Sequence, residues 1–379
     1  MDSTWRVGLL FSRSGATGLP ESEHARGVTL AVDEINQSGG VLGKSIEIVS
    51  CDPCGDHAQY RYLAERLMTE DGVSVIFGCY SSDTRKLMLR TVERRNGLLW
   101  YPSSYEGFEY SPNILYAGPV ASQCVFPLAD YLTSQYGGRA YFAGSDYIFP
   151  HETNRVMRDL VEARGGSVVG ETYLPLAAPL SALERLIIDI RRHQPDFVFS
   201  TLVGETGQTF LRMYHDAGFD ISTRPIASMS MAEAEVARIG ADKCKGIITA
   251  ASYFSTLDTE PNRNFHATAN RLLQQDWPLS MWMASSYAQV HFFARALKIA
   301  QSLDTDHLLQ AAAGMEFEAP EGSMMIDADN NHAWLTPRIG RANASGKFDI
   351  VWSSPELVRP DPYLANSPTA PVALKKRQI

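Results

Sequence analysis

The sequence predicts an α/β protein built on parallel sheets flanked by helices, and two observations lead to this fold class. Short apolar runs alternate with longer amphipathic ones along the chain, which is the pattern of parallel strands joined by crossover helices. The chain has 379 residues, of which 45% are hydrophobic. Because single cores rarely grow beyond about 250 to 300 residues, this length favours two domains.

The individual elements follow from local patterns. Strand-like segments occupy residues 5–11, 46–51, 73–79, 97–101, 139–144, 167–173, 196–203, 224–228 and 246–251. Helix-like segments lie between most of them. Residues 21–37, for example, carry one apolar face and are followed by Gly39-Gly40, a common helix ending. Further helices are expected near 260–274 and 281–302, followed by a hairpin-like end at 323–354 in which SMMIDADNNHAW and KFDIVWSS form the two arms.

Charge and hydropathy exclude several classes of function. A net charge of -9 argues against binding a nucleic-acid backbone, and the basic run Lys375-Lys376-Arg377 is interpreted as part of a solvated tail. No apolar stretch approaches the roughly 20 residues that a membrane span needs. No signal peptide is recognisable after Met1, so we expect a cytoplasmic protein. A periplasmic location is the alternative if Met1 replaces a removed signal peptide.

We expect no metal, no cofactor and no enzymatic activity. Cys51 and Cys54 have the spacing of a redox pair or half a zinc site, but no second pair follows at a matching spacing, and two small residues at a turn are favoured. Residues 38–45, SGGVLGKS, nearly match a phosphate loop, yet they link a helix to a strand and not a strand to a helix. The sequence contains no Gly-x-Ser-x-Gly elbow, no His-Glu-x-x-His pair and no Gly-x-Gly-x-x-Gly motif.

Polar and aromatic residues gather where three predicted strands end. These segments are Tyr80-Ser81-Ser82, Pro102-Ser103-Ser104-Tyr105 and Ser145-Asp146-Tyr147. In an open parallel sheet, ligands bind outside the carboxyl ends of the strands, where helix N-termini present free N–H groups. Each segment alone is explained by helix capping or core packing. Three of them at one crevice favour a binding site.

Four longer segments carry a family resemblance. They are INQSGGVLGKSIEI, FGCYSSDTRK, YPSSYEGFEYSPN and GSDYIFP. In this order they resemble the type I periplasmic-binding-protein superfamily, and within it the branch that handles urea and short aliphatic amides. RPDPY at 359–363 and the lack of a signal peptide make the cytoplasmic amide sensors that negatively regulate aliphatic amidase operons the most similar group. The similarity runs from about Trp5 to Tyr363.

The resemblance implies two Rossmann-like lobes, joined by three chain crossings, with the ligand between them. The expected first lobe comprises residues 1–120 and 255–330, the second lobe 121–254 and 331–363, and the tail 364–379. Carried over by motif, the expected ligand contacts are Ser82, Tyr101, Ser103, Ser104 and Tyr147.

A small neutral amide suits these residues chemically. Its carbonyl oxygen needs donors, which we expect from Ser82 Oγ and from the N–H groups at the start of helix 82–95. Its NH2 group needs acceptors, which backbone carbonyls near 101–103 or a tyrosine hydroxyl can supply. Tyr80, Tyr101 and Tyr147 are the expected aromatic walls.

Two departures from the amide sensors affect the predicted ligand. Ser103-Ser104 stands where the sensors have Thr-Pro, which predicts a roomier and more polar wall. Met231 stands where a threonine is usual, which predicts a more apolar surface on the second lobe. Acetamide therefore does not transfer directly as the ligand.

By resemblance, the protein is a sensor that sequesters an RNA-binding antitermination protein and releases it when an amide binds. A homodimer is also implied, without direct contact to nucleic acid or membrane. The alternative is the substrate-binding component of an ABC importer for urea, short amides or branched-chain amino acids. An amino-acid ligand needs an acid for its ammonium group, and Asp146 and Glu233 are the acids available.

Overall fold

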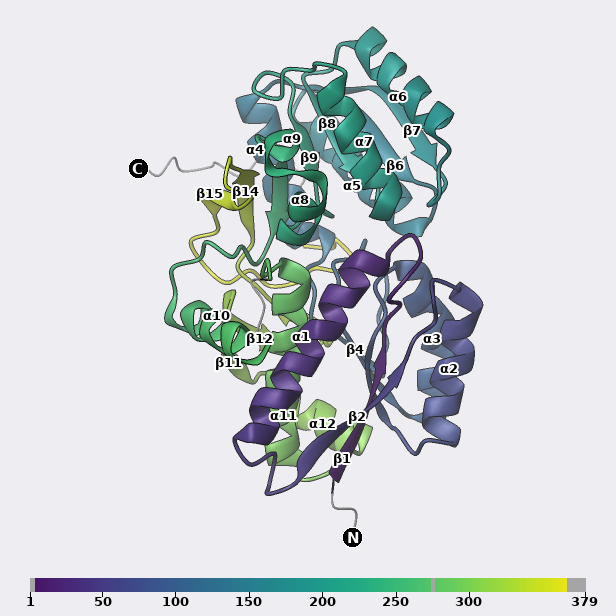
Figure 1. The fold of residues 1–379 in the computed structure, drawn as a ribbon, viewed down its shortest axis with the longest axis vertical. Helices are drawn as coiled ribbons and strands as arrows, with labels where there is room; N and C mark the ends of the chain where they lie inside the picture. The colour runs from purple at the N-terminus through teal and green to yellow at the C-terminus, as the bar shows by residue number, and fades with distance from the viewer. Residues whose placement is uncertain (1–3, 274–276, 367–379) are drawn as a thin grey trace.

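The protein folds into two lobes, each with a sheet covered by helices, which confirms the predicted fold class. The computed structural model describes residues 4–273 and 277–366. Figure 1 shows the teal lobe above and the purple-to-blue lobe, with green helices, below. Each predicted strand is present, with ends within two residues of those expected. Most of the predicted tail from residue 364 lies outside the described residues.

The first lobe contains a five-stranded parallel sheet in the order β2-β1-β3-β4-β5. The strands are β1 (Thr4–Leu10), β2 (Ser45–Cys51), β3 (Val75–Gly78), β4 (Leu98–Tyr101) and β5 (Ile114–Tyr116). Helices α1 (Gly18–Gln37) and α11 (Met281–Ala300) lie on one side of it, and α2 (His57–Thr69) and α3 (Ser82–Arg95) on the other (Figure 1).

Burial on both faces explains why these strands are almost entirely apolar. Along β4, Leu98 and Trp100 join the core under α1 and α11, while Leu99 and Tyr101 join the core under α2 and α3. This alternation follows from the two-residue period of a strand.

The second lobe contains a seven-stranded sheet in the order β15-β14-β10-β9-β8-β6-β7. The parallel strands are β6 (Arg139–Ser145), β7 (Ser167–Leu174), β8 (Phe197–Thr201), β9 (Ile226–Ser228) and β10 (Ile248–Ala251). The antiparallel strands are β14 (Arg338–Ala342) and β15 (Phe348–Ser353). The helices are α4 (Ala121–Gln135), α5 (Ile148–Ala163), α6 (Leu180–His193), α7 (Gly204–Asp216), α8 (Glu233–Ile239) and α9 (Ala241–Cys244).

The end of the chain differs from the expected single hairpin within 323–354. The remaining elements are α10 (Glu260–Leu273), α12 (Thr305–Ala312), β11 (Glu316–Ala319), β12 (Gly322–Ile326) and β13 (Ala333–Trp334). Strand β12 pairs with β11 and β13, whereas β15 pairs with β14 in the sheet of the second lobe. The prediction was wrong because two neighbouring apolar segments, similar in local pattern, belong to different sheets.

The chain passes between the lobes more than once. After β5 it enters the second lobe at α4, and after β10 it leads to α10 and α11, which pack beside α1. It then returns to the second lobe between β13 and β14. The boundaries expected from the resemblance, at residues 120, 254 and 330, stay predictions. Strand β13 lies just beyond residue 330 but pairs with β12, which precedes that boundary.

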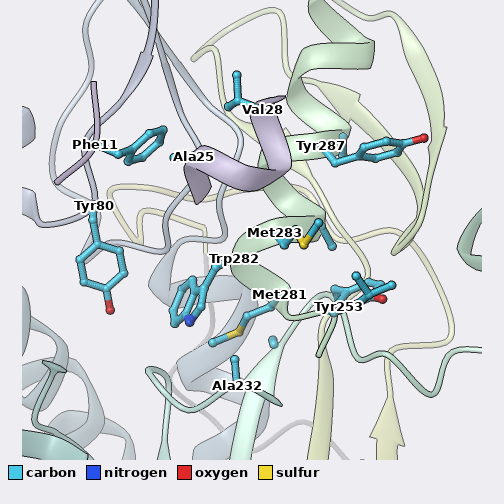
Figure 2. Close-up of a cluster of buried hydrophobic side chains, with 14 of the residues drawn as sticks. Phe11, Ala25, Val28, Tyr80, Ala232, Tyr253, Met281, Trp282, Met283 and Tyr287 are labelled. Carbon is cyan, nitrogen blue, oxygen red and sulfur yellow. The ribbon is translucent and has the colours of Figure 1, made fainter. Parts of the chain in front are cut away.

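One cluster of buried apolar side chains has members in both lobes. Figure 2 shows Trp282 of α11 beside Tyr80, with Ala232 nearby at the edge of the second lobe. The rings of Trp282 and Tyr80 meet edge to face, with centroids 5.4 Å apart. None of the helices in the described residues has the length and apolar character needed to cross a membrane.

Candidate functional site

A narrow cavity lies between the lobes at the carboxyl ends of β3, β4 and β6. It is lined by three residues of the first lobe and three of the second: Tyr80, Ser82, Ser104, Tyr147, Phe149 and Ser230. Its volume is about 10 Å³, roughly the space in which the centre of one water can move. Among the described residues, those lining this cavity carry no charged side chain. The structure therefore brings four of the sequence-predicted residues together around one small neutral space.

The turn after β3 forms the first wall. Cys79 adopts a left-handed backbone (φ 68°) as the chain leaves the sheet, and Ser81 then caps α3 by accepting from the N–H of Thr84. Helix N-termini leave their first N–H groups without partners inside the helix. In the described part of the chain, the N–H groups of Ser82 and Asp83 have no acceptor. Ser82 lines the cavity, so its N–H group is available to a ligand there.

The segment after β4 contributes one lining residue and two supporting ones. Ser104 lines the cavity, and its hydroxyl has no partner among the described residues. Tyr101 lies beneath the wall and donates from its hydroxyl to the carbonyl oxygen of Tyr80 (2.7 Å). Ser103 is buried and is hydrogen-bonded to His24 Nε2 (3.2 Å). Tyr101 and Ser103 were expected as ligand contacts, but the structure places them behind the cavity.

The second wall comes from the turn between β6 and α5. Tyr147 occupies the N-cap position of α5, and Phe149 follows within the first turn. The Tyr147 hydroxyl makes no hydrogen bond within the described residues, so it too is free for a ligand. Asp146, expected at the site, is exposed and hydrogen-bonded to His151 (2.9 Å). It is not among the residues that line the cavity.

A second cavity adjoins the first through Ser230. Met231, expected at the site, lines this neighbour and not the first cavity, together with Ser228 and Glu235. Both Glu235 oxygens accept from Trp282 Nε1 at 3.2 Å, which links α8 of the second lobe to α11 of the first. Burial raises the pKa of Glu235 to about 8, against weaker lowering by its hydrogen bonds. Glu235 is therefore a buried acid close to the site.

Under the first wall lies a buried ion cluster. The Arg85 side chain is fully buried and donates to Glu109 (Nε to Oε1, 2.7 Å), to Glu106 (3.3 Å) and to Ser82 Oγ (3.2 Å). Burial would raise the pKa of Glu109, but Arg85 and Lys86 outweigh it and hold this pKa at about 2. The carboxylates and the guanidinium compensate one another, as buried charges must.

Stacking fixes the guanidinium as well. It lies over the rings of Tyr101 and Tyr105, at 4.8 Å and 4.3 Å from their centroids. Tyr101 and Tyr105 therefore hold the arginine beneath the cavity and do not line it.

Sequence reasoning missed Phe149, Ser230 and the acids Glu106, Glu109 and Glu235. Ser230 follows β9 by two residues, so the rule that ligands bind at strand ends could have identified it. The acids gave no such signal, because their roles depend on packing between distant segments. Glu233, the other acid considered for an amino-acid ligand, is buried and accepts from the N–H of Ser255 instead.

The cysteine pair shows no sign of a metal site. Every cysteine in the chain is free, and no cluster of three or more His, Cys, Asp or Glu in residues 4–273 and 277–366 is placed to hold a metal ion. Cys51 accepts a hydrogen bond from Arg66 (3.0 Å), and Cys54 lies in the exposed turn after β2.

Comparison with known proteins places this architecture in a family. The model of a family described as a periplasmic binding protein domain matches residues 5–369. The chain belongs to this family. A periplasmic binding protein domain is a ligand-binding module, in agreement with a cavity between two lobes.

Named relatives and solved structures extend the comparison. A Leu/Ile/Val-binding protein homolog of Brucella melitensis is 23% identical and covers 92% of this chain and 90% of its own length. A Geobacillus stearothermophilus protein named limonene hydroxylase is 32% identical, but over only 34% of this chain and 24% of that protein. This chain thus spans about a quarter of that relative.

Solved solute-binding proteins share the fold. One from Rhodopseudomonas palustris in complex with p-hydroxybenzoic acid has a TM-score of 0.86 at 20% identity, covering 96% of this chain and 99% of that one. A branched-chain amino acid transporter substrate-binding protein of Streptococcus pneumoniae, in complex with isoleucine, has a TM-score of 0.81 at 20% identity, covering 94% and 100%. These similarities establish the two-lobed fold and not the ligand.

Proposed function

We propose that this chain is the solute-binding component of an importer and that it binds a small neutral amide or urea-like solute between its lobes. The observation that carries the ligand class is the cavity itself, narrow and lined by six uncharged residues, three from each lobe. The relatives, which are named for binding branched-chain amino acids or for ABC transport, support the transport role over the amide-sensing regulator.

The charge of the site disfavours carboxylate ligands such as leucine or benzoate. A buried carboxylate needs a cation or several donors, since its desolvation is otherwise too costly. The cation beneath the wall, Arg85, is already engaged by Glu106 and Glu109. A neutral amide carries no such penalty.

The polar groups of the cavity match an amide or urea. The N–H groups of Ser82 and Asp83 supply donors for a carbonyl oxygen, with the dipole of α3 behind them. The free hydroxyls of Ser104 and Tyr147 can donate or accept. Tyr80 and Phe149 enclose the planar group, which excludes water and limits the length of an alkyl chain.

Ligand size limits the affinity. A solute of about four heavy atoms, at a ceiling near 1.5 kcal/mol per atom, gains at most roughly 6 kcal/mol, which corresponds to a dissociation constant of tens of micromolar. A tighter complex needs further contacts, and Ser228, Met231 and Glu235, which surround the second cavity beside Ser230, are candidates to supply them.

The regulator implied by the sequence resemblance is the second candidate. It uses the same cleft, and the specific observation in its favour is the smallness and neutrality of the cavity, which suit a short amide. Its RNA-binding partner and its homodimer remain predictions from that resemblance. The two functions also differ in location, because an importer component works outside the cytoplasmic membrane and a regulator inside it.

Calorimetric titration tests the ligand class. We expect urea, acetamide and propionamide to bind with dissociation constants in the micromolar range and leucine and 4-hydroxybenzoate to give no heat of binding. Binding of leucine or benzoates with amides silent would overturn the proposed ligand. Copurification with an RNA-binding protein, released by amide, would replace the importer role by the regulator.

A further inference from the structure

The hydroxyl of Ser82 is already committed on two sides by buried charged groups. Its hydrogen is donated to Glu106 Oε2 at 2.5 Å, and its oxygen accepts from Arg85 at 3.2 Å. Arg85 also donates to the second oxygen of Glu106, which closes a ring of three side chains. All three lie in the buried interior, where solvent cannot exchange partners with them.

This arrangement limits what Ser82 can offer a ligand. A serine hydroxyl has one hydrogen and two lone pairs. With the hydrogen held by a carboxylate and one lone pair held by a guanidinium, only one lone pair remains for the cavity. The sequence-based expectation gave Ser82 the role of donor to the ligand carbonyl; in the structure its hydrogen is donated to Glu106 instead.

The directions of these three hydrogen bonds cannot be reversed. Arginine has donors only, and an ionised carboxylate has acceptors only, so neither partner can change its role. The guanidinium is further fixed by Glu109 and by the rings of Tyr101 and Tyr105.

We propose that Arg85 and Glu106 act as positioning residues that hold Ser82 as a hydrogen-bond acceptor, so that the site selects solutes with an N–H group and rejects isosteric carboxylates. This inference rests on the proposed function and specifies its ligand class. It also orients the ligand: the NH2 group faces Ser82 Oγ, and the carbonyl oxygen faces the N–H groups at the start of α3.

Acetamide and acetate have nearly the same shape and differ in this one property. If an acetate oxygen lies next to Ser82 Oγ, a lone pair of the acetate faces a lone pair of the serine. The two oxygens repel each other, and both are left without a hydrogen-bond donor. Sites built to bond an N–H or O–H discriminate strongly against analogues that lack it. We expect acetamide to bind at least about 100-fold more tightly than acetate.

The test is calorimetric titration of acetamide and acetate into three proteins at one pH. In Glu106→Gln, the side-chain amide can donate to Ser82 and release its hydrogen toward the cavity. We expect the ratio of acetamide to acetate affinity to fall at least tenfold. Glu93→Gln is the matched control. Glu93 also accepts from a serine hydroxyl (Ser111 Oγ to Glu93 Oε1, 2.8 Å), but it lies at the opposite end of α3 from Ser82 and does not line the cavity. Its ratio should equal that of the unchanged protein.

Ser82→Ala keeps the test decisive if Glu106→Gln does not fold. It removes the acceptor without disturbing an ion pair, so acetamide should bind at least tenfold more weakly while acetate changes little. Equal affinities for acetamide and acetate in the unchanged protein, or an unchanged ratio in a folded Glu106→Gln, would overturn the role of Ser82 and leave the amide-binding function standing. If neither urea nor acetamide binds the unchanged protein, both proposals fail.

Discussion

Tyr147 and Ser82 face the same cavity from opposite lobes and are held in different ways. Ser82 is bonded to Arg85 and Glu106, whereas the hydroxyl of Tyr147 has no partner among the described residues. A buried polar group without a partner costs free energy, and a ligand that forms a hydrogen bond with it removes this cost and so binds more tightly. At the scale of single residues, each lobe therefore supplies a hydroxyl that can gain a partner when the ligand binds, Ser104 from the first lobe and Tyr147 from the second.

Replacing Tyr147 by phenylalanine should weaken amide binding without loss of fold. The ring remains to close the cavity, but its hydrogen bond to the ligand is lost, which costs about 1 kcal/mol or roughly fivefold in affinity. Titration calorimetry measures the affinity, and thermal unfolding should be unchanged within a degree or two. An unaltered affinity would exclude the hydroxyl from the site.

Glu235 predicts a pH dependence of stability. Burial raises its pKa from 4.5 to about 8, so the folded state binds a proton that the unfolded chain releases. Its stabilising contribution is complete below about pH 4.5 and is lost as the pH rises toward 8. Relative to Glu235→Gln, the free energy of unfolding of the unchanged protein should fall between pH 5 and pH 8.

Urea unfolding of both proteins at pH 5, 6.5 and 8 measures this difference. Burial raises the pKa of Glu21 and of Glu321 to about 7, with the same sign, but these residues are common to both proteins and cancel in the comparison. Parallel pH profiles for the two proteins would contradict the buried state of Glu235.

At the scale of elements, the loop after β1 and the start of α7 meet across the cleft. The N–H of Glu205 donates to the carbonyl oxygen of Ala16 at 3.2 Å. Gly204, with φ 61°, allows this approach, because a Cβ atom there would lie 1.8 Å from the same oxygen. The contact joins the two lobes in the arrangement that encloses the cavity.

Gly204→Ala should therefore hinder closure and weaken amide binding, by about tenfold or more, while each lobe remains folded. Gly218→Ala, just beyond the other end of α7, is the matched control: it shares a positive φ (74°) but has no atom within 4 Å of the added Cβ. Both variants should lose similar stability through backbone strain. Equal ligand affinities in the two variants would show that the contact between Ala16 and α7 does not matter for binding.

Local pattern was enough to predict the strands and the turns that bear the site. Tyr80, Ser82, Ser104 and Tyr147 were all identified from strand ends and motif resemblance, since the carboxyl ends of parallel strands gather at one edge. The partners of Arg85, which lie 21 and 24 residues further along the chain, could not be predicted. Their pairing depends on how the segment after β4 folds back over α3, and that is set by tertiary packing.

At the scale of the whole molecule, the ligand can act only by favouring closed over open lobes. The connections between the lobes consist of short chain segments, and the interface includes the Trp282 contact to Glu235. Small-angle X-ray scattering should show the radius of gyration decreasing when acetamide is added, and a smaller decrease for Gly204→Ala. No change on saturation would contradict ligand-driven closure.

The assignment of segments to lobes needed more than local reading. Helices α10 and α11 return to the first lobe after the whole second lobe has been formed, and the apolar face of α11 matches that of α1 only in three dimensions. A similar limit applies to β12 and β15, which are alike in sequence pattern but separate in space.

A crystal structure of the protein grown with acetamide tests the central claim most directly. We expect the amide between Tyr80 and Tyr147, with its NH2 group at Ser82 Oγ and its carbonyl oxygen at the N–H groups of Ser82 and Asp83. Two results would contradict the account. One is an amide bound only in the second cavity, beside Glu235 and Met231; the other is a carboxylate from the expression host bound in the cavity between Tyr80 and Tyr147.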